Sequence, residues 1–180
     1  MPHVTHVRSM DSYAVREINN RHAGRTSRTP KRPVGKVEQD YLRRIVLKER
    51  DVAGGANIGL ISLTTRYALD HGYDVVLQGI MHAQRYDTML RDLERDHLGS
   101  TAFYYFDVSF AETLRRHDTR PQAAEFGVHE MRRWYHERNL LSFTTERLVT
   151  ETHTLDHTVN RILDAVFDQH IITPDRETTT

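Results

Sequence analysis

The stretch Tyr73-Asp74-Val75-Val76-Leu77-Gln78-Gly79-Ile80 decides the fold class of this chain. Its apolar residues follow one another without a break, whereas a strand with one face in water alternates apolar and polar residues. A continuous apolar run of this length is typical of a strand that is buried on both faces, as in a parallel sheet covered by helices. The sequence therefore predicts an internal strand of an α/β protein at residues 73–80.

Strand and helix patterns alternate on both sides of this stretch. Before it, we expect the end of a short strand at 37–40, a helix beginning at Asp40, a glycine-rich loop at 51–59 and a helix at 60–69. After it, we expect a helix at 86–93, a strand at 102–108, helices at 110–117 and 130–138, a short strand at 147–149 and an amphipathic helix at 155–167. This alternation predicts a doubly wound parallel sheet with helices on both faces.

Ligands of such sheets bind beyond the carboxyl ends of the strands. This rule points to Asp40, to Gln78 and Gly79, and to the segment Asp107-Val108-Ser109. Asp107 has a second interpretation, because a carboxylate just before a helix at Phe110 also fits an N-cap.

Length and composition exclude several classes of protein. The chain has 180 residues, of which 38% are hydrophobic and 28% charged, enough for one domain with its own core. It contains no cysteine, which excludes disulfides and thiolate chemistry. It has neither an apolar run of about 18 residues nor the apolar segment of a secretory signal. We therefore expect a cytoplasmic protein without a membrane partner.

The formal net charge is zero, but the charge is unevenly distributed. Residues 1–36 carry eight Lys or Arg against two acidic residues, so this segment is strongly basic and residues 37–180 are acidic in balance. The segment also lacks hydrophobic periodicity, which is typical of a disordered region or a basic arm. We expect a boundary near residue 36, with the folded domain at 37–180.

Three strings, VEQDYLRR at 37–44, HGYDVVLQGIMHAQRY at 71–86 and FYYFDVSFAETLRRHDTRPQAAEFGVHEMRRWY at 103–135, resemble a family of small bacterial P-loop kinases. The family is related in layout to gluconate kinase and chloramphenicol phosphotransferase. The resemblance implies a three-layer P-loop NTPase fold of the nucleoside-kinase type. It also implies ATP, with Mg²⁺ bound to the nucleotide, and phosphorylation of a small hydroxyl-bearing molecule.

The chain departs from the family pattern at two points. Gln78 stands where the family strand usually carries Glu, so the shape is kept and the charge is lost. No Walker A motif is present, and the nearest string, Asn19–Thr26, lacks the first Gly and has Arg in place of Lys. A Walker A loop needs Gly for its backbone to wrap the phosphates and Lys to reach them. We therefore expect the N-terminal strand and the P-loop to be degenerate.

A frame shift in the gene is one explanation for the missing loop. One choice of codons for Arg16–His22 encodes Gly-Lys-Ser-Thr-Ile-Ala, the end of a Walker A motif, when it is read one base later. The alternative is a natural basic arm on a degenerate kinase. Since the first strand is central in this fold, we expect a poorly stable sheet, or Tyr13–Ile18 in use as a replacement strand.

The resemblance assigns Asp40 as the group that orients the acceptor hydroxyl and takes its proton. The residues alone also favour a helix N-cap at this position. Arg43, one turn further on, either holds an anionic acceptor or lies on a solvated helix face. Gln78 and Gly79 are the other candidate substrate-binding residues.

Arginines after the strand at 102–108 match the mobile lid of the family. Arg116 and Arg120 are the candidates for covering the phosphates, because a guanidinium matches phosphate oxygens in shape and charge. Further lid candidates are Arg115, Arg132 and Arg133, and for all of these a charged surface helix is the alternative. We expect Trp134 and Tyr135 to pack under the lid.

Other functions compete with the kinase interpretation. His153 and His157 are spaced i, i+4, but no third ligand is evident, so we expect no metal held by the protein itself. The basic arm at 1–36 could contact nucleic acid, although it lacks interleaved aromatic residues. A third alternative is a catalytically inactive kinase-like module that binds a small molecule or a partner. Stabilisation by ATP would separate the enzyme from these rivals.

Overall fold

The computed structural model of this chain describes residues 4–8, 32–119 and 121–167. Its strands are β1 (Val4–Arg8), β2 (Val34–Glu38), β3 (Asp74–Gly79), β4 (Thr101–Asp107) and β5 (Arg147–Thr150). Its α-helices are α2 (Ala56–Asp70), α3 (Ala83–Asp96), α4 (Phe110–His117), α5 (Val128–Trp134) and α6 (Leu155–Phe167). A π-helix, η1 (Tyr41–Val46), and a 3₁₀-helix, η2 (Pro121–Ala124), complete the described elements.

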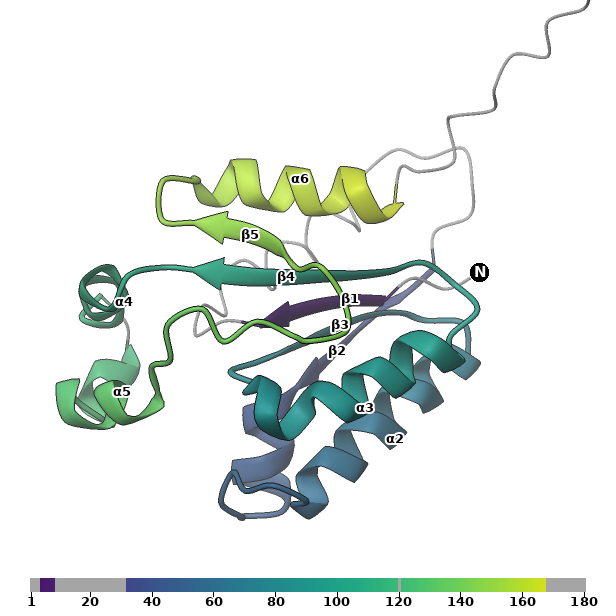
Figure 1. The fold of residues 1–180 in the computed structure, drawn as a ribbon, viewed down its shortest axis with the longest axis horizontal. Coiled ribbons are helices and arrows are strands. Elements are labelled where there is room, and N and C mark those ends of the chain that lie inside the picture. Colours follow the sequence, from purple (N-terminus) through teal and green to yellow (C-terminus); the bar gives the residue numbers. More distant parts are fainter. Residues whose placement is uncertain (1–3, 9–31, 120, 168–180) are drawn as a thin grey trace, which may run out of the picture.

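The five strands form one parallel sheet in the order β2-β3-β1-β4-β5. Strand β1 occupies the middle, where Val4 pairs with Val75 of β3 on one side and with Thr101 of β4 on the other. Consecutive parallel strands need crossover connections, and from β2 onwards the helices between the strands supply these. The strands therefore end at a common edge of the sheet, beyond which α4 and α5 lie (Figure 1).

Helices cover both faces of the sheet, as the sequence predicts (Figure 1). On one face, Val75 and Leu77 of β3 and Phe103 of β4 pack with buried residues of α2 and α3. On the other face, Val76 and Tyr104 pack with Val159, Ile162 and Leu163 of α6. The apolar run at 73–80 is thus buried on both sides, because successive side chains of β3 enter two different cores.

The central strand is formed by Val4–Arg8, within the segment expected to be a disordered arm. The replacement strand considered at Tyr13–Ile18 lies outside the described residues. The boundary expected near residue 36 falls inside β2, so the sheet includes residues from both sides of it. The ladders of the central strand are therefore made, whereas the sequence predicts either their loss or a replacement strand at 13–18.

Several helix boundaries differ from the expected ones, and for two of them a long-range hydrogen bond lies at the boundary. Helix α2 begins at Ala56, inside the stretch expected to be a loop up to Gly59, and the carboxylate of Glu49 accepts a hydrogen bond from the backbone of Asn57. This remote carboxylate satisfies a free N–H of the first turn in place of a local cap. Helix α5 ends at Trp134 instead of residue 138, because Tyr135 is extended and its hydroxyl donates to the carbonyl of Val108 (3.0 Å).

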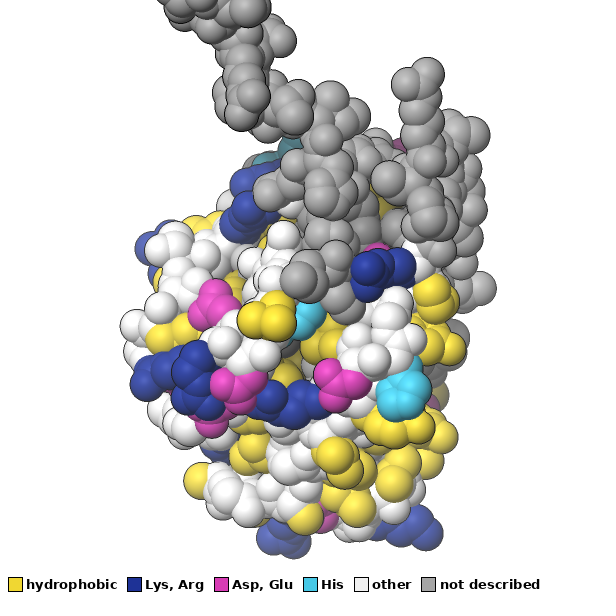
Figure 2. Space-filling model, turned by 90° about the vertical axis from the view of Figure 1, so that its right-hand side faces the viewer, with side chains coloured by type: hydrophobic (Ala, Val, Ile, Leu, Met, Phe, Trp, Pro, Cys, Tyr) yellow, Lys and Arg dark blue, Asp and Glu magenta, His cyan; other side chains and the backbone are white. Residues whose placement is uncertain are grey.

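The view from the right of Figure 1 looks onto the molecule at the amino ends of the strands. Figure 2 shows basic and acidic side chains next to one another in a band across this face, with hydrophobic side chains below it. At the C-terminal ends of α2 and α3, Arg66 pairs with Asp96 (2.9 Å), and Arg95 pairs with Asp92 (2.7 Å) and Asp96 (2.7 Å). The charges of these two helix ends therefore offset one another.

Candidate functional site

Asp40 follows β2 at the carboxyl edge of the sheet, where the fold predicts a ligand. Its side chain is half exposed, and Oδ1 accepts a hydrogen bond from Nη2 of Arg43 at 2.6 Å. Asp40 occupies the N-cap position of η1, as the alternative interpretation has it, but its side chain makes no capping bond there. The second interpretation of Arg43 is wrong, since its side chain is only 18% exposed and also donates to the carbonyl of Glu49 (3.3 Å).

Gln78 and Gly79 end the neighbouring strand β3. The amide of Gln78 donates to the carboxylate of Glu38, its register partner on β2 (2.9 Å). Lys36 also forms an ion pair with Glu38. The end of β3 therefore lies beside a carboxylate that the neighbouring strand supplies, although Gln78 itself has no charge.

A buried polar cluster lies next to Asp40, and no local sequence pattern predicts it. The hydroxyl of Tyr86 accepts hydrogen bonds from the amides of Gln39 (3.1 Å) and Asn57 (2.7 Å) and donates to Asp51 (2.6 Å). Arg85 binds the other oxygen of Asp51 at 2.6 Å. We call these five residues the Tyr86 cluster. Three distant parts of the sequence meet here, and periodicity identified Tyr86 only as an apolar position of α3.

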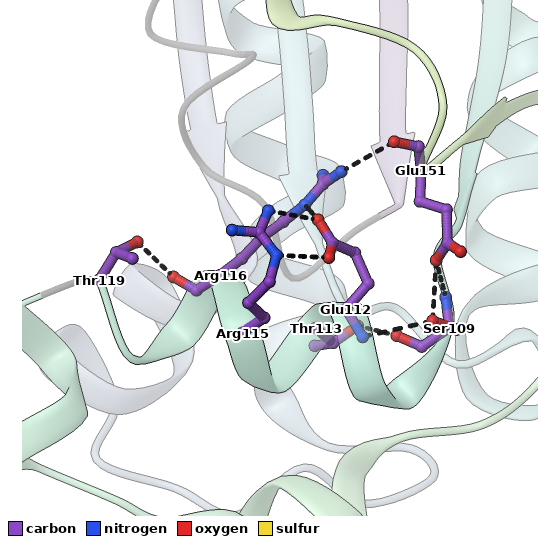
Figure 3. A network of polar contacts seen from close by, with 7 residues as sticks. All are labelled: Ser109, Glu112, Thr113, Arg115, Arg116, Thr119 and Glu151. Carbon is purple, nitrogen blue, oxygen red and sulfur yellow. Dashed lines mark hydrogen bonds and ion pairs between the residues drawn. The ribbon is translucent and has the colours of Figure 1, made fainter.

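Helix α4 holds two of the lid candidates together (Figure 3). Glu112 accepts two hydrogen bonds from Arg115, at 2.6 and 2.7 Å, and one from Arg116 at 2.8 Å. These bonds, those of Arg115 first, lower the pKa of Glu112 to about 2. The side chain of Arg115 is 69% exposed, whereas that of Arg116 is 25% exposed and also reaches the carbonyl of Glu151 (3.4 Å). Arg116 is therefore the more closely held of the two.

The first turn of α4 is fixed from its own N-cap and from the loop after β5. Ser109 is the N-cap, and its hydroxyl accepts from the backbone of Glu112. The carboxylate of Glu151 accepts from the backbone and the hydroxyl of Ser109, at 3.0 and 2.8 Å (Figure 3). The interpretation of Asp107 as the cap is therefore wrong, because that side chain forms an ion pair with Arg138 at 3.4 Å.

Helix α5 packs against α4 through aromatic contacts. Tyr135 contacts Phe110, with ring centroids 5.2 Å apart, and Trp134 contacts Phe126 at 5.0 Å. The guanidinium of Arg132 lies 3.8 Å from the centre of the Phe110 ring, and Arg133 is exposed. Buried His117 hydrogen-bonds the carbonyl of Phe126 (2.9 Å) and stacks on its ring. Trp134 and Tyr135 thus pack against Phe126 and Phe110, their packing under a lid stays a prediction, and Arg120 lies outside the described residues.

The structure thus brings the candidate residues into two groups. Asp40, Arg43, Gln78 and Gly79 lie at the ends of β2 and β3, next to the Tyr86 cluster. Arg115 and Arg116 lie on α4, beyond the end of β4. The arrangement is that of a parallel sheet with a carboxylate at one strand end and cationic side chains over another.

Solved structures share this arrangement of strands and helices. The chain is similar to APE1195, with 16% identity over 95% of this chain and 97% of that one and a TM-score of 0.64. It is also similar to the APS kinase CysC of Mycobacterium tuberculosis in complex with AMPPNP and APS, with 11% identity, coverages of 91% and 96%, and a TM-score of 0.62. The fold is that of a P-loop kinase.

A gluconokinase from Sinorhizobium meliloti has the same kinase fold, with 12% identity, coverages of 94% and 97%, and a TM-score of 0.51. This confirms the fold that the three strings predict, including the likeness in layout to gluconate kinase. No family model matches the chain, and no curated protein matches its sequence.

Among residues 4–8, 32–119 and 121–167, no group of three or more His, Asp or Glu side chains is placed to hold a metal ion. The rings of His153 and His157 stack on each other, with centroids 5.0 Å apart. Within the described residues no helix is both long and apolar enough to cross a membrane.

Proposed function

We propose that this chain is an ATP-dependent phosphotransferase that acts on a small hydroxyl-bearing molecule. The observation that carries the proposal is an accessible carboxylate, Asp40, at the end of β2 in a P-loop kinase fold, with Arg43 at 2.6 Å. ATP would supply the phosphoryl group. In a kinase the protein contributes mainly positioning and electrostatic stabilisation, and a carboxylate beside the acceptor hydroxyl serves both purposes.

The residues at the two strand ends divide this work. The acceptor oxygen forms a bond to the terminal phosphorus, the bond from that phosphorus to the ADP oxygen breaks, and Asp40 takes the hydroxyl proton. Arg43 holds the carboxylate in one orientation and contributes positive charge for an anionic acceptor. Gln78 and Gly79 line the acceptor side, and the absence of a side chain on Gly79 lets Gln39 pack against the end of β3.

Arginines on α4 would compensate the negative charge of the transferred phosphoryl group. Arg116, with Arg115 beside it, presents guanidinium groups that match phosphate oxygens. Both are now bound to Glu112, so phosphate would compete with that carboxylate. Arg120, Arg132 and Arg133 remain further candidates for this role. The segment after β1 that holds phosphates in P-loop proteins lies outside the described residues here.

The first experiment measures ATP binding and phosphoryl transfer separately. Thermal unfolding with and without ATP and Mg²⁺ reports binding, and ADP formation with a panel of sugars, sugar acids and nucleosides reports transfer. Asp40→Asn should lower kcat by about 10²- to 10⁴-fold, with the same thermal shift by ATP. Asp92→Asn is the matched control, because Asp92 forms a similar i, i+3 ion pair with Arg95 (2.7 Å) on the surface of α3.

The outcomes distinguish the proposal from its rivals. Stabilisation by ATP without transfer to any acceptor would favour an inactive kinase-like binding module. No effect of ATP would exclude the phosphotransferase. The basic N-terminal segment remains a candidate nucleic-acid contact, and affinity for single-stranded DNA that falls steeply with salt would support that role.

A further inference from the structure

Tyr86 is the centre of the buried cluster next to Asp40. Its side chain is fully buried, and its hydroxyl has three partners: the amides of Gln39 and Asn57 as donors and the carboxylate of Asp51 as acceptor. A phenol hydroxyl has one proton to donate and two lone pairs, so these three bonds use its full capacity. The hydroxyl therefore fixes the direction of every polar group around it.

The hydroxyl proton of Tyr86 points towards Asp51. Burial, and after it the hydrogen bond to Asp51, raises the pKa of Tyr86 above its ordinary value of 10.0. The hydroxyl thus stays protonated at physiological pH and donates to Asp51, whose other oxygen is bound by Arg85. Gln39 and Asn57 are left with the lone pairs, so their amide N–H groups must point at Tyr86.

The cluster reaches the candidate catalytic carboxylate through Gln39. This residue is 2% exposed and directly precedes Asp40. On one side its amide is bound by Tyr86, and on the other its side chain lies against the backbone of Gly79, so close that a Cβ on Gly79 would be 2.5 Å from the Cβ of Gln39. Gln39 is thereby held between β3 and α3. This fixes the position of the backbone that leads into Asp40.

The cluster also fixes the segment that returns from Asp40 to the core. Asp51 and Asn57 lie on the two sides of the turn between η1 and α2, and Arg43 donates to the carbonyl of Glu49 in the same segment. One hydroxyl on α3 thus holds both ends of the segment that carries Asp40 and Arg43.

We propose that Tyr86 is the positioning residue of this site, holding Asp40 and Arg43 in place through Gln39 and Asp51. The proposal rests on the proposed function. Tyr86 does not touch the reacting groups in this role. Displacement of a reacting group by about 1 Å costs on the order of 10²-fold in rate, so loss of the hydroxyl should impair phosphoryl transfer more than nucleotide binding.

The test compares two buried tyrosines that lie on opposite faces of the sheet. Tyr86→Phe removes the central hydroxyl, and Tyr104→Phe removes a hydroxyl that accepts one hydrogen bond from Arg147 (3.1 Å) beside α6. We expect Tyr86→Phe to lower kcat per folded molecule by about tenfold or more, with the KM for ATP within about twofold of wild type. Tyr104→Phe should change neither value by more than about twofold.

Hydrogen–deuterium exchange supplies a readout that does not depend on activity. In Tyr86→Phe, backbone amides of residues 39–57 should exchange faster, while those of β4 and β5 should not change. If Tyr86→Phe misfolds, Gln39→Met removes the same link and keeps an unbranched side chain of similar length. Unchanged exchange at 39–57 in the folded variant, or unchanged kcat, would overturn the positioning role. A wild-type chain without kinase activity would instead overturn the proposed function, and the exchange measurement would still test Tyr86.

Discussion

Gln39 occupies the space that a side chain on Gly79 would need. A Cβ added to Gly79 would lie 2.5 Å from the Cβ of Gln39, and Gly79 has φ of +156°, a conformation that residues with a side chain rarely adopt. Both facts apply at the end of β3, beside the candidate acceptor site. The glycine there is required by the fold, whatever its role towards a substrate.

Gly79→Ala should therefore destabilise the protein by about 2 kcal/mol or more, through overpacking and backbone strain together. Gly59→Ala is the matched control, because Gly59 lies within α2 and a Cβ there meets nothing within 4 Å. That change should stabilise by about 0.5 to 1 kcal/mol. Urea unfolding of the two variants measures both values. Equal stability of the two variants would contradict the close approach of Gln39.

Gln78→Glu should place two carboxylates side by side, since Gln78 now donates to Glu38 at 2.9 Å. The variant loses this bond and gains repulsion, which the ion pair of Lys36 with Glu38 offsets only in part. We expect a loss of about 1 kcal/mol or more at pH 7. The loss should shrink as the pH falls below about 4, where a carboxylate takes up a proton. Thermal unfolding from about pH 2.5 to about pH 8 tests this, and Gln78→Met controls for loss of the bond alone.

The two lid candidates on α4, Arg115 and Arg116, should differ in their effect on nucleotide use. Arg116 is mostly buried and bound at two points, so it is already oriented, whereas Arg115 is largely exposed. Arg116→Ala should lower kcat/KM for ATP by about 10- to 100-fold, the equivalent of one lost charge-assisted hydrogen bond. Arg115→Ala should lower it by no more than a few-fold. Steady-state kinetics with ATP measures kcat/KM for both variants. A larger loss in Arg115→Ala than in Arg116→Ala would assign the main phosphate contact to Arg115.

Glu112 should contribute stability only above acidic pH. Its folded pKa is about 2, below the ordinary 4.5, because Arg115 and Arg116 hold the carboxylate. A lowered folded pKa means that the contribution is complete above about pH 4.5 and is lost as the pH falls towards 2. The difference in Tm between wild type and Glu112→Gln should therefore be largest near neutral pH and shrink below 4.5. A constant difference over that range would mean that Glu112 is not held in this way.

The elements that the sequence predicts well are those with a strong local pattern. Strand β3 contains the unbroken apolar run Val75–Leu77, and α6 repeats its apolar residues every helical turn, so burial follows directly from the pattern. Strand β1 has no such signal: its five residues include a histidine and an arginine within a basic segment. It is a strand because β3 and β4 pair with it from far along the chain, and such pairing leaves no mark on local composition.

The same distinction applies to the site. Asp40 and Arg43 are three residues apart on a helical turn, so their contact follows from the spacing. Tyr86 joins Gln39, Asp51 and Asn57, and no periodicity brings these positions together. The start of α2 escaped prediction for a related reason, since Glu49 caps it from eight residues upstream and a local capping residue is lacking.

The central place of β1 has a consequence for the order in which the protein folds during synthesis. The ribosome makes Val4–Arg8 first, but its two neighbours begin only at Asp74 and Thr101. Until β3 has emerged, strand β1 has no ladder to join, and until β4 has emerged its other edge stays unpaired. Parallel pairings over such distances are slow to form, because the chain loses entropy when the long loop closes, before the contacts between the strands can form. The nascent chain therefore keeps unpaired strand edges exposed late into its elongation, which makes folding more dependent on chaperones than folding of a sheet built from neighbouring hairpins.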